Sequence, residues 1–175
     1  PTLALQVMVS DTDRHTICFG CNPIGSAILD PLFVRWSDQE SPFDWTPTSL
    51  NTSGGVTLTA GSYIVGAIKT RQEILIFTNN SIHSMRFSGA PFTYEFDVVN
   101  EGLSMVSPNA ATNAGDMVFF MDRGGFYFYN GAIQRLKCTV LDYVFSNLNA
   151  SEEFKIFATT SLDFSEVYWF YPVGS

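Results

Sequence analysis

Several features that mark common classes of protein are scarce in this sequence. No apolar run approaches the roughly 20 residues that a transmembrane helix needs, and no charged stretch followed by an apolar one marks a signal peptide at the N-terminus. Only nine of the 175 residues are Lys or Arg, against 17 Asp and Glu, and the nine are scattered along the chain. A surface that grips nucleic acid normally clusters its basic residues. The sequence therefore predicts no membrane segment and no tight binding of DNA.

Residues and motifs that carry chemistry are also few. The sequence contains no glycine-rich phosphate loop, no G-x-S-x-G elbow and no H-E-x-x-H motif. Cys18 and Cys21 have the C-x-x-C spacing of redox and zinc sites, but a structural zinc site needs four ligands. The other candidate ligands are distant in sequence: Cys138, His15 and His83. We therefore interpret the two thiols as half-buried residues at a strand end and both histidines as ordinary sheet residues. No catalytic residue, no cofactor and no enzymatic activity are expected.

Strand-forming residues, in contrast, are abundant. Hydrophobic residues make up 46% of the chain and Phe occurs sixteen times, which suits one domain with a sizeable core. Short aromatic and β-branched runs bounded by turn residues predict β-strands throughout. Asn130-Gly131 is a strong hairpin signal between two such runs. One short helix is expected at Val140–Asn147, with Thr139 as its N-cap.

The strands recur with a regular period. Similar groups begin at Ile64, Pro108 and Phe154, which are 44 and 46 residues apart. Four antiparallel strands repeating at that spacing are typical of β-propeller blades, with a β-sandwich as the alternative. The predicted fold is therefore all-β, a partial propeller of antiparallel four-stranded blades in one domain. Its expected parts are a partial blade with a Pro- and Trp-rich connector (1–63), a blade (64–107), a blade with the short helix (108–153) and the start of a further blade (154–175).

The most apolar strand of each repeat is expected to be a central strand, buried on both faces between neighbouring blades. These strands are Ile74–Phe77, Met117–Phe120 and Val167–Phe170. Phe119 and Trp169, which lie in two of them, are therefore expected to contribute to blade packing or to a subunit interface.

The segment "RWSDQESPFDWTP", residues 35–47, raises the question of a binding site. Its three carboxylates are Asp38, Glu40 and Asp44. Such a cluster is a candidate calcium site, but the D-x-D-x-D-G pattern is absent and two prolines stiffen the chain. A glycosidase acid pair is a further alternative that depends on fold analogy alone. Because Trp36 and Trp45 flank the loop and large aromatic rings can pin it onto a sheet face, we favour a structural connector without a metal.

Three stretches of the sequence together resemble a known family. They are "RWSDQESPFDWTP", "TRQEILIFTNNSIHSMRF" and "NAATNAGDMVFFMDRGGFYFYNGAIQRLKCTVLDYVF". They are similar to segments of the nozzle or tail-hub proteins of short-tailed bacteriophages, also called tail tubular or packaged-DNA stabilisation proteins. The resemblance extends from about Arg14 to the C-terminus. Members of this family are much longer than 175 residues, so we expect this chain to be a piece of a longer polypeptide.

The resemblance implies a structural virion protein without catalytic residues. It would form a homo-oligomeric ring that extends the portal channel, contacts portal, adaptor and other tail proteins, and retains and conducts DNA without sequence-specific binding. Its location would be the virion tail, assembled in the bacterial cytoplasm. A negative lumen suits that role because it repels phosphate. The alternative function is a carbohydrate-binding or carbohydrate-cleaving propeller of a tail tip, which exposed Trp and Tyr around an acidic cleft would favour.

Overall fold

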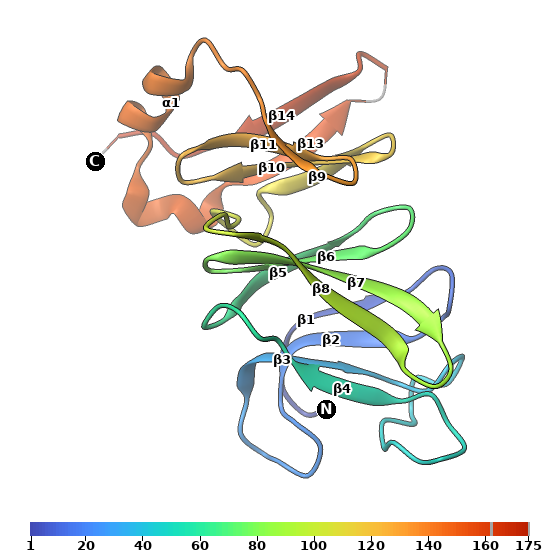
Figure 1. Cartoon of the computed structure of the whole chain (residues 1–175). Helices are drawn as coiled ribbons and strands as arrows, with labels where there is room; N and C mark the ends of the chain where they lie inside the picture. Colours follow the sequence, from blue (N-terminus) through green and yellow to red (C-terminus); the bar gives the residue numbers. More distant parts are fainter. Residues whose placement is uncertain (162, 175) are drawn as a thin grey trace.

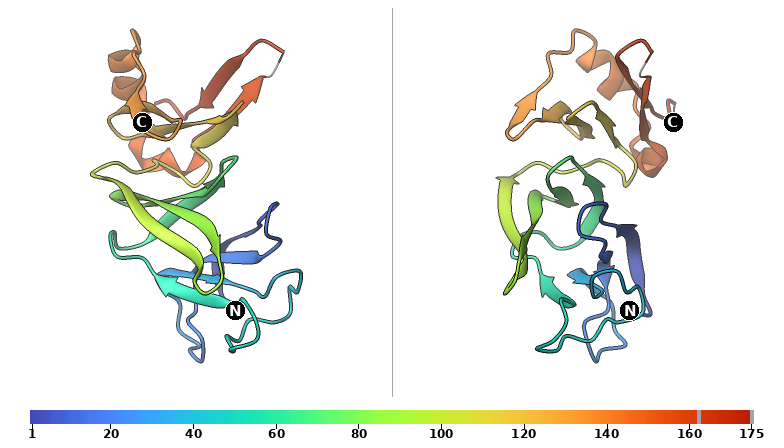
Figure 2. Two further views of the ribbon diagram at one scale, coloured as in Figure 1. Left: turned by 45° about the vertical axis from the view of Figure 1, so that its right-hand side comes forward. Right: turned by 90° about the vertical axis from the view of Figure 1, so that its right-hand side faces the viewer.

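The computed structural model describes residues 1–161 and 163–174, which form a mostly β structure. Three antiparallel sheets have four strands each and a fourth has two. Within each sheet, strands that follow one another in sequence also pair with one another, as in a propeller blade. The sheets follow one another in chain order along the molecule (Figure 1), and the two rotated views show successive sheets turned relative to each other (Figure 2). The prediction of an all-β fold built from antiparallel, blade-like sheets is confirmed.

We number the sheets as blades 1 to 4 in chain order. Blade 1 contains β1 (Ala4–Val9), β2 (Thr16–Cys21), β3 (Asp30–Trp36) and β4 (Gly54–Thr57). Blade 2 contains β5 (Ile64–Lys69), β6 (Ile74–Thr78), β7 (Ser81–Gly89) and β8 (Thr93–Glu101). Blade 3 contains β9 (Ala111–Ala114), β10 (Met117–Asp122), β11 (Gly125–Tyr129) and β12 (Ile133–Arg135). Blade 4 contains β13 (Phe157–Ser161) and β14 (Glu166–Phe170).

Blade 1 corrects the prediction that residues 1–63 form only a partial blade, because it has four paired strands. The strand missed from the sequence is β4, whose residues Gly54 and Gly55 disfavour strands. Aromatic rings of the neighbouring β3 cover both glycines. A Cβ added at Gly54 would lie 2.6 Å from the Trp36 ring, and one at Gly55 would lie 2.5 Å from the Phe33 ring. Glycine is therefore required for these rings to lie against the strand.

Two hydrophobic clusters hold the blades together. The first joins blades 1 and 2, and its fully buried members include Ile17, Phe19 and Ile76. The second joins blades 2 and 3 and extends to blade 4; in it Phe77 and Phe120 meet edge to face with ring centroids 5.1 Å apart. Alternate residues of each inner strand thus pack against the next blade, which is how face-to-face blades share a core.

The three strands expected to be central differ in burial. All five residues of β6 are buried, as predicted. In β10, Val118 and Phe120 are buried but Phe119 is only half-buried. The prediction is wrong for Val167–Phe170. This strand lies at the edge of the two-stranded blade 4, with Tyr168 and Phe170 exposed by 40% and 50%.

The short segments between blades 3 and 4 cover part of the core. The predicted helix is present as α1 (Leu141–Asn147), but its N-cap is Val140 and not Thr139, and no side chain caps it. A 3-10 helix, η1 (Ala150–Lys155), follows it. The predicted hairpin is present, since Tyr129 pairs with Ile133 across the Asn130-Gly131 turn. No helix in the part of the chain that the structure describes is long and apolar enough to cross a membrane.

Candidate functional site

The connection between β3 and β4, residues 37–53, contains the three carboxylates considered for calcium, and we call it the acidic loop. Asp38 accepts hydrogen bonds from the backbone N–H (2.8 Å) and the hydroxyl (2.7 Å) of Thr52. These two bonds hold the pKa of Asp38 below its usual value. Glu40 pairs with Arg14, and Asp44 accepts from the side chain of Asn51 at 3.2 Å. Each carboxylate therefore has its own protein partner. Among residues 1–161 and 163–174, no group of three or more His, Cys, Asp or Glu side chains is arranged to hold a metal ion.

Calcium is accordingly expected to leave the melting temperature of the protein unchanged at millimolar concentration. A ligand raises the melting temperature only if it binds the native state more tightly than the unfolded state. The measurement is thermal unfolding with calcium, with magnesium and with a chelator, on the wild type and on Asp44→Asn. A clear rise with calcium that Asp44→Asn abolishes would restore the ion-site interpretation.

The two tryptophans of this segment lie on different parts of blade 1. Trp36 is buried towards blade 2, where its ring meets Tyr94 edge to face at 5.1 Å and its indole N–H donates to the carbonyl of Thr52 (2.9 Å). Trp45 lies over the guanidinium of Arg35, which donates to the carbonyl of Trp45 (2.9 Å). Both rings therefore tie the acidic loop to blade 1.

A buried polar network lies where the acidic loop meets blades 1 and 2. His15 is fully buried, and its Nδ1 lies 2.8 Å from Oδ2 of Asp13 while its Nε2 lies 3.0 Å from the hydroxyl of Thr52. Asp13 also accepts hydrogen bonds from Ser10 and from the hydroxyl of Tyr94 in β8. The network thus joins the β1–β2 turn, the acidic loop and the second blade. This corrects the prediction that His15 is an ordinary sheet residue: it precedes β2 and sits at a junction between blades.

The carboxylate of Asp13 is stabilised as an anion. Burial alone raises its pKa, but the hydrogen bonds from Ser10, Tyr94 and His15 outweigh burial and lower the pKa overall. Burial and the neighbouring carboxylate raise the pKa of Tyr94, so its hydroxyl remains a donor. Ser10, Asp13 and Tyr94 line a cleft of about 420 Å³ between blades 1 and 2.

The side chains of Asp13, His15 and Thr52 contact one another in the order carboxylate, imidazole, hydroxyl. In hydrolases the same arrangement supplies an orienting carboxylate, a base and a nucleophile. Two observations oppose that chemistry. The Thr52 hydroxyl donates to Asp38 (2.7 Å) and does not line the cleft. His15 has no exposed surface. What the hydrogen bonds show is that the network joins the β1–β2 turn, the acidic loop and blade 2.

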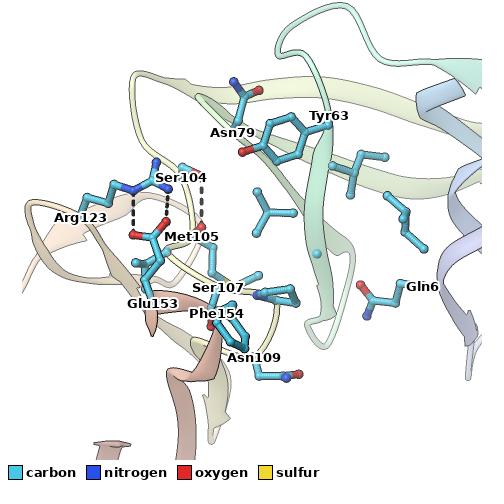
Figure 3. Close-up of a pocket in the computed structure, with 16 residues that line it drawn as sticks. Gln6, Tyr63, Asn79, Ser104, Met105, Ser107, Asn109, Arg123, Glu153 and Phe154 are labelled. Carbon is cyan, nitrogen blue, oxygen red and sulfur yellow. Dashed lines mark hydrogen bonds and ion pairs between the residues drawn. The ribbon is translucent and has the colours of Figure 1, made fainter. Parts of the chain in front are cut away.

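A second cavity, of about 580 Å³, lies among blades 1, 2 and 3. Figure 3 shows the ion pair of Arg123 and Glu153 on one side of it and Gln6, Tyr63 and Asn79 on the other. The amide of Gln6 donates to the carbonyl of Ala67 (2.9 Å) and accepts from its N–H (2.7 Å), which ties β1 to β5. Both charged side chains that line the cavity are paired with each other. Because its polar groups serve the contacts between blades, we assign no ligand to this cavity.

The remaining candidate residues include two buried thiols and a buried histidine. Cys18 and Cys21 are both buried in β2 and all three cysteines are free thiols. Burial raises the pKa of Cys18, and burial together with the nearby Cys18 raises the pKa of Cys21 to about 12, so neither is a thiolate at neutral pH. His83 lies in β7, where burial lowers its pKa. Phe119 and Trp169 line a groove between blades 3 and 4.

No protein-family model matches the chain, and no curated protein is significantly similar to it.

Proposed function

We propose that this chain is a structural part of an assembly of blades, and that this assembly is the ring-shaped tail nozzle or hub of a short-tailed phage. The observation that carries the proposal is that both ends of the blade stack are apolar and uncovered. On blade 1, four apolar side chains are exposed on β1 and on the residue just before it: Leu3, Leu5, Val7 and Val9. On blade 4, Phe157, Tyr168 and Phe170 form an exposed aromatic row. Apolar rows of this kind are buried where blades meet inside the chain, so further blades or subunits would cover them.

The charge distribution supports a role beside DNA without tight binding of DNA. Among the described residues, six of the nine cationic side chains pair with carboxylates, and Arg35 is buried. The net charge is −8. A surface with few free cations cannot replace the counterions of the phosphate backbone. DNA would therefore pass such a surface without binding tightly.

The tryptophans favour this proposal over a carbohydrate-active propeller. A sugar site built on the tryptophans would need their rings exposed for stacking. Here Trp36 is buried between blades, Trp169 donates to the carbonyl of Ala110 in the junction of blades 3 and 4 (3.1 Å), and Trp45 lies against Arg35. The resemblance to phage tail proteins supports the same choice.

Electron microscopy of the purified chain tests the proposal. We expect ring- or arc-shaped particles of uniform width in negative stain at high protein concentration. We also expect no release of sugar from bacterial polysaccharides, because the Thr52 hydroxyl donates to Asp38 and His15 is fully buried. A stable monomer that cleaves polysaccharide would contradict the proposal and favour the alternative.

A further inference from the structure

His15 is a fully buried histidine with hydrogen-bond partners on both ring nitrogens. Its Nδ1 lies 2.8 Å from Oδ2 of Asp13, and its Nε2 lies 3.0 Å from the hydroxyl oxygen of Thr52. A neutral imidazole ring has one donor and one acceptor nitrogen, whereas the protonated ring has two donors. The partners of the two nitrogens therefore determine how many protons the ring carries.

The Asp13 side requires a proton on Nδ1. An ionised carboxylate accepts hydrogen bonds and donates none. Asp13 is ionised because hydrogen bonds from Ser10, Tyr94 and His15 outweigh its burial and lower its pKa. The hydroxyl of Tyr94, 3.1 Å from Nδ1, donates its own proton to Asp13. The contact of 2.8 Å between Nδ1 and Asp13 therefore needs an N–H donor on the ring.

The Thr52 side requires a proton on Nε2 as well. The hydroxyl of Thr52 has one proton, which it donates to Oδ1 of Asp38 at 2.7 Å. Its oxygen also accepts from the backbone N–H of Gln39 (3.1 Å). Hydrogen bonds from Thr52 hold the pKa of Asp38 below its usual value, so this carboxylate is ionised too and supplies no proton. Nε2 therefore donates to the hydroxyl oxygen of Thr52.

The charge balance of the junction leads to the same assignment. Burial of a carboxylate is costly in free energy unless a cation pairs with it. Asp13 is only 3% exposed. Neither Asp13 nor Asp38 forms an ion pair with a Lys or Arg among residues 1–161 and 163–174. A doubly protonated His15 supplies the positive charge that the buried carboxylate needs.

The other groups around the ring leave this balance unchanged. Strand β7 contributes the uncharged ring of Phe87, with centroids 5.8 Å apart, and β8 contributes Tyr94. Arg14, which precedes His15 in the chain, is exposed and paired with Glu40. The other charged groups that line the cleft beside Asp13 have partners of their own: Asp11 with Lys69, Arg71 with Asp116 and Glu73 with the hydroxyl of Tyr129.

Strained backbone gathers at the same junction. The described chain has four non-glycine residues with a positive φ, and three of them adjoin the network: Arg14 (56°), Glu40 (57°) and Thr93 (59°). The N–H of Glu40 donates to the carbonyl of Arg14 (3.1 Å), and the hydroxyl of Thr93 donates to the carbonyl of Thr52 (3.2 Å). Such conformations cost free energy and concentrate at switch regions. A weakened network would therefore favour release of these segments.

We propose that His15 carries two ring protons in the folded protein and that the proton on Nε2 is a switch for the acidic loop. Asp38 and Thr52 lie near the two ends of this loop, so the hydrogen bonds between them close it. Loss of the proton turns Nε2 into an acceptor. The hydroxyl of Thr52 then donates to Nε2 in place of Asp38, and the closure weakens.

The sign of the pH dependence follows from this exchange of partners. The acidic loop is held while His15 has both protons and is released as the pH rises and one proton leaves. Histidine protonation biases other pH-sensitive proteins in the same way. The switch acts within one copy of the chain and does not depend on the assembly proposed above.

Nitrogen-15 NMR of the whole chain, labelled at its two histidines, tests the protonation state. His83 is the internal reference, because burial lowers its pKa and its Nε2 donates to the carbonyl of Ala60 (3.1 Å). At a pH at which His83 shows one protonated ring nitrogen, His15 is expected to show two. A His83→Gln variant assigns the signals. A His15 ring that becomes neutral together with His83, or before it, would overturn the proposal.

Thr52→Val removes the acceptor of Nε2 and keeps a side chain of similar shape. In this variant His15 is expected to lose its second proton at a lower pH than in the wild type. Thr57→Val is the matched control, because Thr57 lies on β4 and donates to Asp30 (3.2 Å), outside the network. The control should leave the titration of His15 unchanged. Identical titration of His15 in the wild type and in Thr52→Val would contradict the assignment of the Nε2 proton.

Hydrogen–deuterium exchange measured by mass spectrometry tests the release of the loop. Protection factors compare each exchange rate with that of an unstructured chain at the same pH, which removes the direct effect of pH. The protection of residues 39–51 is expected to fall at least about tenfold as His15 loses its second proton, because a hydrogen bond to a charged group is lost. The buried strand β6 is the reference segment, and its protection should stay constant.

His15→Gln is expected to show the lower protection of the loop at every pH, since glutamine does not titrate. Both readouts are also obtained on the wild type, so the test does not depend on the folding of any variant. A loop whose protection stays constant while NMR shows the second proton leaving His15 would overturn the switch.

Discussion

Phe120→Ala is expected to lower the free energy of unfolding by about 3–5 kcal/mol. Phe120 is fully buried between blades 2 and 3, edge to face with Phe77 (5.1 Å) and stacked on Tyr127 (5.5 Å). Truncation removes buried apolar surface and leaves a cavity that the rigid strands on either side cannot fill. Urea unfolding monitored by tryptophan fluorescence gives the change in free energy.

Phe119→Ala is the matched control, one position away on the same strand. Its ring is half-buried, stacks on Phe128 at 5.8 Å and lines the groove between blades 3 and 4. Because that groove is already open, truncation should create little new cavity and cost clearly less than truncation of Phe120. An equal or larger loss for Phe119→Ala would show that the two faces of β10 are buried alike, as the sequence alone suggested.

The sequence predicted strands and turns correctly where the local pattern of apolar and turn residues matches their burial and pairing in the fold. The apolar run of β6 is buried on both faces, and the Asn130-Gly131 turn forms the predicted hairpin. The strand β4 could not be predicted from the sequence, because glycine disfavours a strand. The need for its two glycines becomes clear only from the rings of Phe33 and Trp36, which lie against them from the adjacent strand. The exposure of Val167–Phe170 could not be predicted from the sequence either. An apolar strand is buried only if another element packs on it, and the apolar pattern of the strand does not show which element that is.

The buried polar network was missed for a related reason. Asp13 and Tyr94 are 81 residues apart, and only the packing of blade 1 on blade 2 brings them together. The local signal is the Asp-x-His spacing of Asp13 and His15, but the sequence analysis treated His15 as an ordinary sheet residue and did not consider Asp13. In contrast, the sequence itself lacks the D-x-D-x-D-G pattern of a calcium loop. The structure adds the individual partners of Asp38, Glu40 and Asp44.

Asp13→Ala is expected to lower the free energy of unfolding by at least about 3 kcal/mol. The substitution leaves Ser10, His15 and Tyr94 as buried donors without their acceptor, and each such loss costs about 1–3 kcal/mol. Asp116→Ala is the control, since Asp116 is an exposed carboxylate paired with Arg71, and such pairs contribute about 0–1 kcal/mol. Urea unfolding at neutral pH measures both variants. A similar small loss for the two would show that the network does not stabilise the junction of blades 1 and 2.

The same carboxylate should make stability depend on pH. The pKa of Asp13 is lower in the folded protein than in the unfolded chain, so its contribution is present above the unfolded value of about 3.9 and is lost as the pH falls through the folded pKa. The difference in unfolding free energy between the wild type and Asp13→Asn is therefore expected to be largest at neutral pH and to shrink below about pH 4. Asp116→Asn should follow the wild type at every pH, because no buried network depends on its charge. Thermal and urea unfolding from about pH 7 to about pH 2 supply the comparison. A difference for Asp13→Asn that stays constant over this range would mean that the hydrogen-bond geometry, and not the charge of Asp13, stabilises the junction.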